Sequence, residues 1–219
     1  GVRRVVEVSQ LSPRPHAHSP RTRQHWLSEQ VFDWADVGAV HLRATVFYEN
    51  IGVLATAGLA RPGELAMPLG AGTTTIPLVG TADLVRVAVA LLDQTAPPAE
   101  PYYRFVGATP TITELVGEMG SALGVPLQYV EIDAQTWREE ALANGFDAHA
   151  VEHLSRLWDL FSSRTLRAGL DTKVTDSVDR VTGGSAQTLA EFFAANRADL
   201  LGRLGRQRPE TIFAADVAT

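Results

Sequence analysis

The chain has no cysteine among its 219 residues. This absence excludes disulfide bonds, thiolate nucleophiles and cysteine metal sites, and it is consistent with a cytoplasmic protein. No apolar run approaches the roughly 20 residues that a membrane helix needs, and the N-terminus enters strand-like sequence without the features of a secretory signal. The net charge of −6 argues against nucleic acid as the main partner. We therefore expect a cytoplasmic protein that binds neither membranes nor nucleic acid.

The rest of the composition is typical of a globular protein that folds as one domain, or as one domain with a small lobe. Hydrophobic residues make up 45% of the chain and charged residues 20%. We find no internal repeat and no low-complexity segment. The predicted organisation therefore depends on the order of the strand-like and helix-like segments.

The N-terminal part predicts a strand, a helix and a second strand. Residues 4–9 are rich in valine, which favours a buried strand, and a proline-rich loop follows. From residue 23 apolar side chains recur at helical spacing, with Trp26, Leu27, Val31 and Trp34 on one face of a helix that ends near residue 36. Residues 40–46 are the second strand. A unit of this kind predicts two adjacent parallel strands in one sheet.

The remainder alternates helices with short strands, so the predicted fold class is α/β. Thr111 and Glu114 form a capping box at the start of one helix, and Gly124 ends that helix. Glycines mark turns between residues 52 and 72, and the tail after residue 205 is expected to fray. The other predicted elements are an extended segment at 73–79, strands at 102–107 and 127–132, and helices at 83–92, 135–144, 148–168 and 188–204.

Gly117, Gly120 and Gly124 have a spacing similar to that of phosphate-binding glycines, but their position argues against that role. A phosphate-binding loop lies in the turn between a strand and a helix, where backbone N–H groups point at the ligand. These glycines fall inside and at the end of the helix that begins after Thr111. We therefore assign them to helix packing and to a helix C-cap.

Several short motifs follow one another along almost the whole chain. They are Val5-Val6-x-Val8-Ser9, Arg23-x-His25-x-x-x-Glu29, Leu42-Arg43 with Phe47-Tyr48-Glu49-Asn50, Tyr103-x-x-x-Gly107, and Thr175-Asp176-x-Val178 with Thr188-Leu189-x-Glu191-Phe192. Each motif is weak alone, but their order and spacing resemble the NmrA-like family of atypical short-chain dehydrogenase/reductases. Ala44 departs from the family's pattern, which has a proline at this position.

The resemblance implies a partial doubly wound, Rossmann-like parallel sheet and a smaller C-terminal α/β lobe over the substrate. Residues 1–50, with 81–107, would be the remaining part of an NAD(P)-binding domain. Residues 51–80 and 108–204 would form the substrate lobe, and residues 205–219 a tail. The family's first strands and glycine-rich loop have no counterpart before Gly1, so we expect about the first third of a family member to be missing. NADP or NAD is the cofactor expected of a complete member.

The catalytic pair of short-chain dehydrogenases, Tyr-x-x-x-Lys, is absent from the chain. Lys173 is the only lysine, and no tyrosine stands four residues before it. In the resembling family the position of His25 lies near the nicotinamide ribose, which makes His25 the candidate catalytic residue. A histidine there is suited to bind a ribose hydroxyl or to act as an acid or base near neutral pH. The alternative is an ordinary surface histidine at a helix start.

Ser9, Arg43, Thr45 and Phe47 are predicted to bind the cofactor together with His25. Ser9 ends a parallel strand at the edge where doubly wound folds bind ligands, although a strand-end serine can equally cap its own loop. Arg43, Thr45 and Phe47 follow the second strand toward the same edge. Arg43 is otherwise explained as a partly buried ion-pair residue.

Three functions remain open from the sequence. The first is an NAD(P)H-dependent reductase of a quinone-like, aromatic or carbonyl substrate. The second is a non-catalytic NAD(P) redox sensor that acts through a protein partner, and the third is a truncated remnant without cofactor. No metal site is predicted, because His16 and His18 have no evident third ligand. No G-x-S-x-G sequence supports a serine hydrolase.

Overall fold

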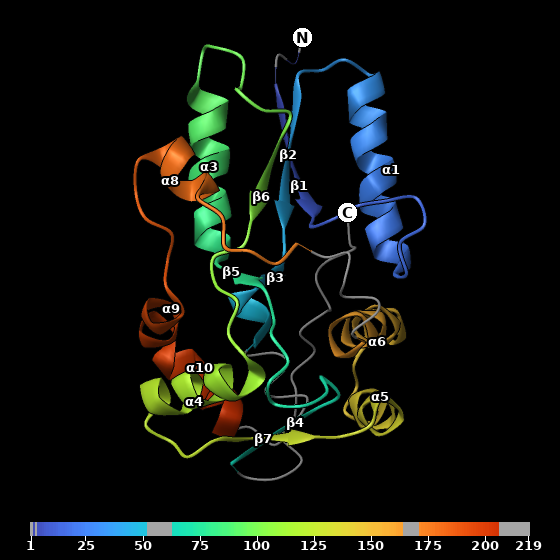
Figure 1. Ribbon diagram of the computed structural model, residues 1–219, viewed down its shortest axis with the longest axis vertical. Helices are drawn as coiled ribbons and strands as arrows, with labels where there is room; N and C mark the ends of the chain where they lie inside the picture. The colour runs from blue at the N-terminus through green and yellow to red at the C-terminus, as the bar shows by residue number, and fades with distance from the viewer. Residues whose placement is uncertain (1, 3, 52–62, 164–170, 206–219) are drawn as a thin grey trace. The chain divides into compact units, whose positions relative to one another are not determined.

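The computed structural model describes residues 2, 4–51, 63–163 and 171–205 (Figure 1). The chain divides into two compact units. The first comprises Gly1–Tyr48, Pro77–Thr109 and Leu170–Thr188, and the second comprises Glu49–Ile76, Pro110–Gly169 and Leu189–Thr219. Three predicted features lie outside the described residues: the turns at 52–62, the last residues (164–168) of the helix predicted at 148–168, and the tail at 206–219.

Three parallel strands form the main sheet of the first unit. β1 (Val5–Gln10), β2 (Ala39–Ala44) and β6 (Tyr102–Phe105) lie in the order β1-β2-β6. Ser9 pairs with Arg43, and Arg43 pairs with Arg104 in the next strand. The helix α1 (Pro20–Trp34) connects β1 to β2. The predicted adjacency and parallel orientation of the first two strands are confirmed.

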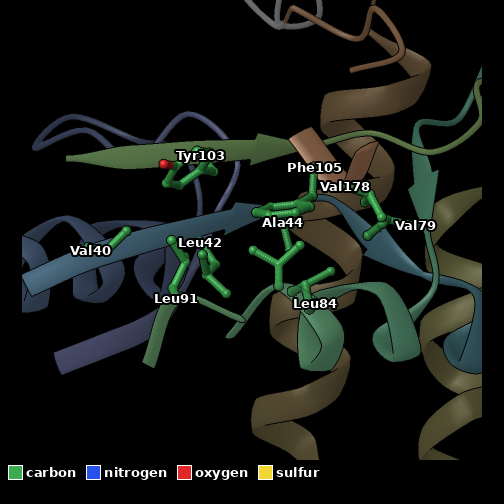
Figure 2. Close-up of a cluster of buried hydrophobic side chains, with 10 residues drawn as sticks. Val40, Leu42, Ala44, Val79, Leu84, Leu91, Tyr103, Phe105 and Val178 are labelled. Atoms are coloured by element: carbon green, nitrogen blue, oxygen red, sulfur yellow. The ribbon is translucent and has the colours of Figure 1, made fainter. Parts of the chain in front are cut away.

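One face of this sheet packs an apolar core against α3 (Thr81–Asp93) and α8 (Ser177–Thr182), as Figure 2 shows. The alternation of side chains along β2 sends every second residue to this face. Burial of each large aliphatic side chain contributes about 1.5–3 kcal/mol, which fixes α3 on the sheet. The buried members of the cluster are Val40, Leu42, Ala44, Val79, Leu84, Val87, Leu91, Tyr103, Phe105 and Val178.

The opposite face of the sheet is polar and is covered by α1. The apolar stripe of that helix faces outward: Leu27, Val31 and Trp34 are 52%, 57% and 77% exposed. Thr22 and Glu29 are instead buried on the helix. This is the reverse of a usual surface helix, whose apolar stripe faces the core. The stripe expected from the sequence exists, but polar contacts attach α1 to the sheet.

Leu170–Thr188 joins the first unit through polar contacts as well as through α8. Asp83, fully buried near the start of α3, accepts hydrogen bonds from the Gln187 backbone N–H at 3.0 and 3.2 Å. Arg104 of β6 donates to the Asp171 carboxylate at 2.8 Å. The expected division placed this segment in the C-terminal lobe. These contacts to α3 and β6 explain why it belongs with the sheet instead.

The first unit also contains a short parallel pair, β3 (Val46–Phe47) with β5 (Leu78–Val79). The α/β class, the parallel sheet and the helices on both of its faces agree with the predicted partial doubly wound fold.

The second unit contains another parallel pair, β4 (Glu64–Met67) with β7 (Gln128–Glu131). Its helix α4 (Ile112–Leu123) begins with the predicted capping box: Thr111 Oγ1 accepts from Glu114 N–H at 3.2 Å, and Glu114 Oε2 accepts from Thr111 N–H at 2.8 Å. Gly124 ends the helix with a φ of 70°. A Cβ at Gly120 would lie 2.9 Å from the carbonyl oxygen of Val125. The structural assignment of these two glycines is confirmed.

The described part of this unit also contains the helices α5 (Ala134–Ala143), α6 (Ala148–Ser162), α9 (Leu189–Ala195) and α10 (Arg197–Gly205). Trp137 and Trp158 join α5 to α6 through an edge-to-face contact with centroids 5.8 Å apart. The prediction of a single helix at 188–204 is wrong, because Asn196 separates α9 from α10. The side-chain amide of Asn196 donates to the carbonyl of Phe192 at this break. The sequence also failed to predict β4 and α8.

Candidate functional site

Ser9 lies near the carboxyl end of β1 and is buried, with 3% of its surface exposed. Among the described residues its hydroxyl oxygen has no hydrogen-bond partner. A buried hydroxyl without a partner costs about 1–3 kcal/mol of stability, so native proteins seldom keep one without a reason. The expected alternative, in which this serine caps its own loop, therefore has no support from the hydrogen bonds of the described chain. A ligand or an ordered water would satisfy this group.

His25 lies in the second turn of α1, and its imidazole is half-buried. Burial lowers the pKa of His25 below its ordinary value of 6.5; Glu7 raises it, Arg21 lowers it and Glu29 raises it. The net effect leaves the ring neutral at pH 7, because a pKa below 6.5 keeps the proton off at that pH. A neutral imidazole has one donor and one acceptor nitrogen, which suits it to bind a ligand hydroxyl.

Three polar contacts, spread along α1, attach the helix to β1 and β2. In the first turn, Thr22 Oγ1 donates to Gln10 Oε1 at 2.7 Å. In the third turn, Glu29 binds Arg43. In the last turn, Asp33 Oδ1 lies 3.0 Å from Nε2 of His41. The described side chains between this helix and the sheet thus form a polar layer, with His25 between its first and second contacts.

Arg43 contacts Glu29 on one side and Tyr102 on the other. Its Nε donates to Glu29 Oε1 at 3.0 Å and its Nη2 donates to Glu29 Oε2 at 2.6 Å, which is the bidentate geometry of a strong pair. Its guanidinium also lies 3.9 Å from the ring centroid of Tyr102, a cation–π contact. The ion-pair alternative considered for Arg43 is therefore present. A role in ligand binding would use the guanidinium donors that Glu29 leaves free.

Thr45 and Phe47 continue the chain beyond β2, as expected. The hydroxyl of Thr45 donates to the carbonyl of Pro77 at 2.8 Å, which leaves its oxygen able to accept a further bond. Phe47 pairs with Val79 in the short β3–β5 ladder and packs partly buried against the apolar core. Of the five predicted residues, Ser9, His25 and Arg43 share the α1 side of the sheet, and the assignment of all five to a cofactor stays a prediction.

Sequence reasoning missed the partners that organise this layer. Glu29 was noted only as part of a family motif, yet its carboxylate binds Arg43. Tyr102 was assigned to a strand but to no functional role. Glu7 and His41 were not singled out, although they pair across β1 and β2. A signal was available, because charged residues at alternate positions of two adjacent strands share one face. Charges on a face that a helix covers predict partners on that helix.

The geometry also limits the chemistry of the site. The described part of the chain holds no group of three or more side chains arranged to bind a metal ion. Wherever the chain is described, no helix is long and apolar enough to cross a membrane. The polar layer contains the neutral imidazole of His25, the Ser9 hydroxyl, which has no partner in the described part of the chain, and Arg43, which Glu29 holds in place. These groups can bind and orient a polar ligand and can exchange a proton with it.

No family model matches the chain. It is 26% identical over 200 residues to an NAD(P)H azoreductase from Xenophilus azovorans, covering 90% of this chain and 66% of that relative. The structure is similar to that of an NADPH-dependent quinone oxidoreductase from Escherichia coli, with a TM-score of 0.73 and 19% identity, covering 89% of this chain and 66% of that one. It is also similar to NmrA, a negative transcriptional regulator in complex with NAD, with a TM-score of 0.56 and 11% identity, covering 88% and 63% of the two chains.

The chain thus spans about two thirds of the length of these proteins. The resemblance predicted from the sequence motifs is confirmed at the level of the fold, since NmrA and a reductase with the same parallel α/β architecture are both structural neighbours. This chain has the Rossmann-like fold of the NmrA-like proteins.

Proposed function

We propose that the protein binds NAD(P)H and reduces a quinone-like, aromatic or carbonyl compound. The hydroxyl of Ser9, in the polar layer between β1–β2 and α1, has no partner among the described residues, and this observation carries the proposal. It lies near the carboxyl end of a parallel strand, where doubly wound folds bind their ligands. The azoreductase relative and the quinone oxidoreductase neighbour support the reaction class.

The described residues fit the nicotinamide end of the cofactor. A nicotinamide riboside presents hydroxyl and carboxamide groups, which need both donors and acceptors. Ser9 Oγ and the neutral imidazole of His25 offer both. The glycine-rich strand-to-helix turn that binds a diphosphate is not among the connections described, so this fit concerns the nicotinamide end alone.

When bound, NAD(P)H supplies a hydride, and the protein supplies orientation and a proton. Ser9 would bind the ligand through its hydroxyl. His25, neutral at pH 7, would hydrogen-bond a ribose hydroxyl, or would pass a proton from water to the reduced substrate by accepting it at one ring nitrogen and releasing the proton of the other. Arg43, the register partner of Ser9 and held by Glu29, would keep a positive charge on the face of the sheet that Ser9 shares, which favours the negative charge that builds on a substrate oxygen or nitrogen during reduction.

NAD(P)H oxidation by the gene product that contains this chain tests the proposal directly. Cofactor binding is measured first, and turnover is then followed against a panel of quinones, azo dyes and aldehydes. His25→Ala should lower cofactor affinity or turnover by ~10-fold or more, which is the effect of losing a hydrogen bond to a polar ligand group. His16→Ala, in the exposed loop before α1, serves as the control. Equal activity in both variants would remove His25 from the site.

A redox sensor is the second candidate. The fold of NmrA, a regulator described in complex with NAD, and the absence of a Tyr-x-x-x-Lys pair favour it. A sensor would bind the oxidised and reduced cofactors with different affinities and would turn over none of the substrates in the panel. Turnover with any of these substrates would exclude it.

A further inference from the structure

Glu29 is the most deeply buried carboxylate of the α1 layer, with 1% of its surface exposed. A buried carboxylate needs a cationic partner, because removing a charge from water costs several kcal/mol when it is unpaired. Arg43 provides that partner with two hydrogen bonds. The pair links the third turn of α1 to β2, in register with Ser9 on β1.

Glu29 also faces the candidate catalytic histidine. His25 and Glu29 are four residues apart on α1, so their side chains emerge on the same side of the helix, one turn apart. The charged groups that act on His25 are Glu7 from β1 and Arg21 and Glu29 from α1. Both carboxylates favour the protonated imidazole, whereas burial and Arg21 oppose it.

Tyr102 also limits the movement of Arg43. Its guanidinium stacks on Tyr102 of β6, so the aromatic ring and the Glu29 carboxylate hold it from two directions. Of the contacts that the described residues make with the guanidinium, the ring contact would remain without Glu29, and a cation–π contact is weak at a partly exposed site. The position of the positive charge beside Ser9 therefore depends on Glu29.

We propose that Glu29 is a positioning residue of this site: it holds Arg43 beside Ser9 and places its carboxylate next to His25. The catalytic consequence rests on the proposed function. The electrostatic part concerns the protein without ligand and is tested independently of any reaction.

The first experiment follows the imidazole of His25 by NMR during a pH titration of the unliganded protein. In Glu29→Gln, a substitution of nearly the same shape, the titration midpoint of His25 should move to lower pH, because a charge that favours the imidazolium is lost. Asp33→Asn is the matched control. It removes a carboxylate one turn further along the same helix, which binds His41, and it should leave His25 unchanged. An unchanged midpoint in Glu29→Gln overturns the proposal.

A double variant separates positioning from a purely structural role. Glu29→Leu with Arg43→Met replaces the buried pair by apolar side chains, an exchange that often preserves or raises stability. If Glu29 only supports the fold, this variant should match the wild type in both unfolding free energy and His25 titration. Positioning predicts recovered stability with a titration midpoint that stays below the wild-type value.

Turnover provides the final readout. If the protein reduces a substrate with NAD(P)H, the acid limb of the kcat/KM profile should move in Glu29→Gln in the same direction as the NMR midpoint, while Asp33→Asn should keep the wild-type profile. A profile that does not move would overturn the catalytic consequence. Absence of turnover in the wild type would instead contradict the proposed reductase function, and the NMR comparison would still decide the role of Glu29.

Discussion

Nδ1 of His41 lies 2.6 Å from Oε2 of Glu7, and the two residues are direct register partners on β2 and β1. The second ring nitrogen lies 3.0 Å from Asp33 Oδ1 of α1. One buried imidazole therefore ties together both strands and the helix that connects them. Because the apolar stripe of α1 faces outward, this contact and the Glu29–Arg43 pair replace the hydrophobic burial that usually holds such a helix.

His41→Leu should destabilise the protein by about 3 kcal/mol, because the mostly buried Glu7 carboxylate loses its partner. Urea unfolding followed by circular dichroism measures the loss. His16→Leu in the exposed loop is the control, and it should change the unfolding free energy by less than about 0.5 kcal/mol. Equal values for the two variants would show that the three-way contact adds nothing to stability.

Two glycines of α4 should respond in opposite ways to the same substitution. Gly117 is exposed and a Cβ there would meet nothing within 4 Å, so Gly117→Ala should stabilise the protein by about 0.5–1 kcal/mol through helix propensity. At buried Gly120 a Cβ would press on the carbonyl of Val125, so Gly120→Ala should destabilise it by about 1–3 kcal/mol. Thermal or urea unfolding of both variants measures the difference. The same sign for both would contradict the packing of α4 against residue 125.

Acid should weaken the start of α4. Hydrogen bonds from the backbone and side chain of Thr111 lower the pKa of Glu114 below its ordinary value of 4.5. The unfolded state then binds a proton first, so the contribution to stability is complete above pH 4.5 and is lost as pH falls through the lowered pKa. Glu114→Gln keeps an acceptor oxygen but does not titrate. The stability advantage of the wild type over this variant should shrink between about pH 5 and about pH 3, and a constant difference would contradict the assignment.

The sequence predicted those parts of the fold whose signals are local. Valine-rich segments gave β1 and β2, and the Thr111–Glu114 pair gave the start of α4. The break at Asn196 was missed because the helical pattern continues across it, and β4 was missed because its pairing with β7 depends on distant residues. Pairing between distant segments produces little recognisable pattern in the sequence of a four-residue strand.

The candidate site was likewise predictable only in part. Family position indicated Ser9 and His25, but the polarity of the layer around them follows from α1 presenting Glu29 and Asp33 to the sheet. The apolar spacing of α1 indicated a helix with one apolar face, and such a face usually packs against the core. The charged residues of β2 determine which face of α1 packs against the sheet. The periodicity within α1 alone carries no information about those partners.

Ser9 and Thr22 provide the most direct test of the site, because their hydroxyls differ in having a partner. Thr22 Oγ1 donates to Gln10, whereas Ser9 Oγ is buried and, among the described residues, unpartnered. Thr22→Val should therefore cost about 1 kcal/mol of stability, while Ser9→Ala should leave stability unchanged or raise it by about 1 kcal/mol. Urea unfolding of the unliganded protein measures both.

Cofactor or substrate binding should show the reverse order. The unsatisfied hydroxyl of Ser9 lowers the stability of the fold, and a ligand that hydrogen-bonds it would explain why it is kept. Ser9→Ala should therefore weaken NAD(P)H or substrate binding by ~10-fold, the effect of one lost hydrogen bond to a polar ligand. Thr22→Val should bind as the wild type does, because its hydroxyl is already used within the protein. Titration of the two variants with NADPH, followed by the steady-state KM for a quinone, measures the difference. A Ser9→Ala protein that is more stable and binds both ligands normally would assign the hydroxyl to a buried water and remove Ser9 from the site.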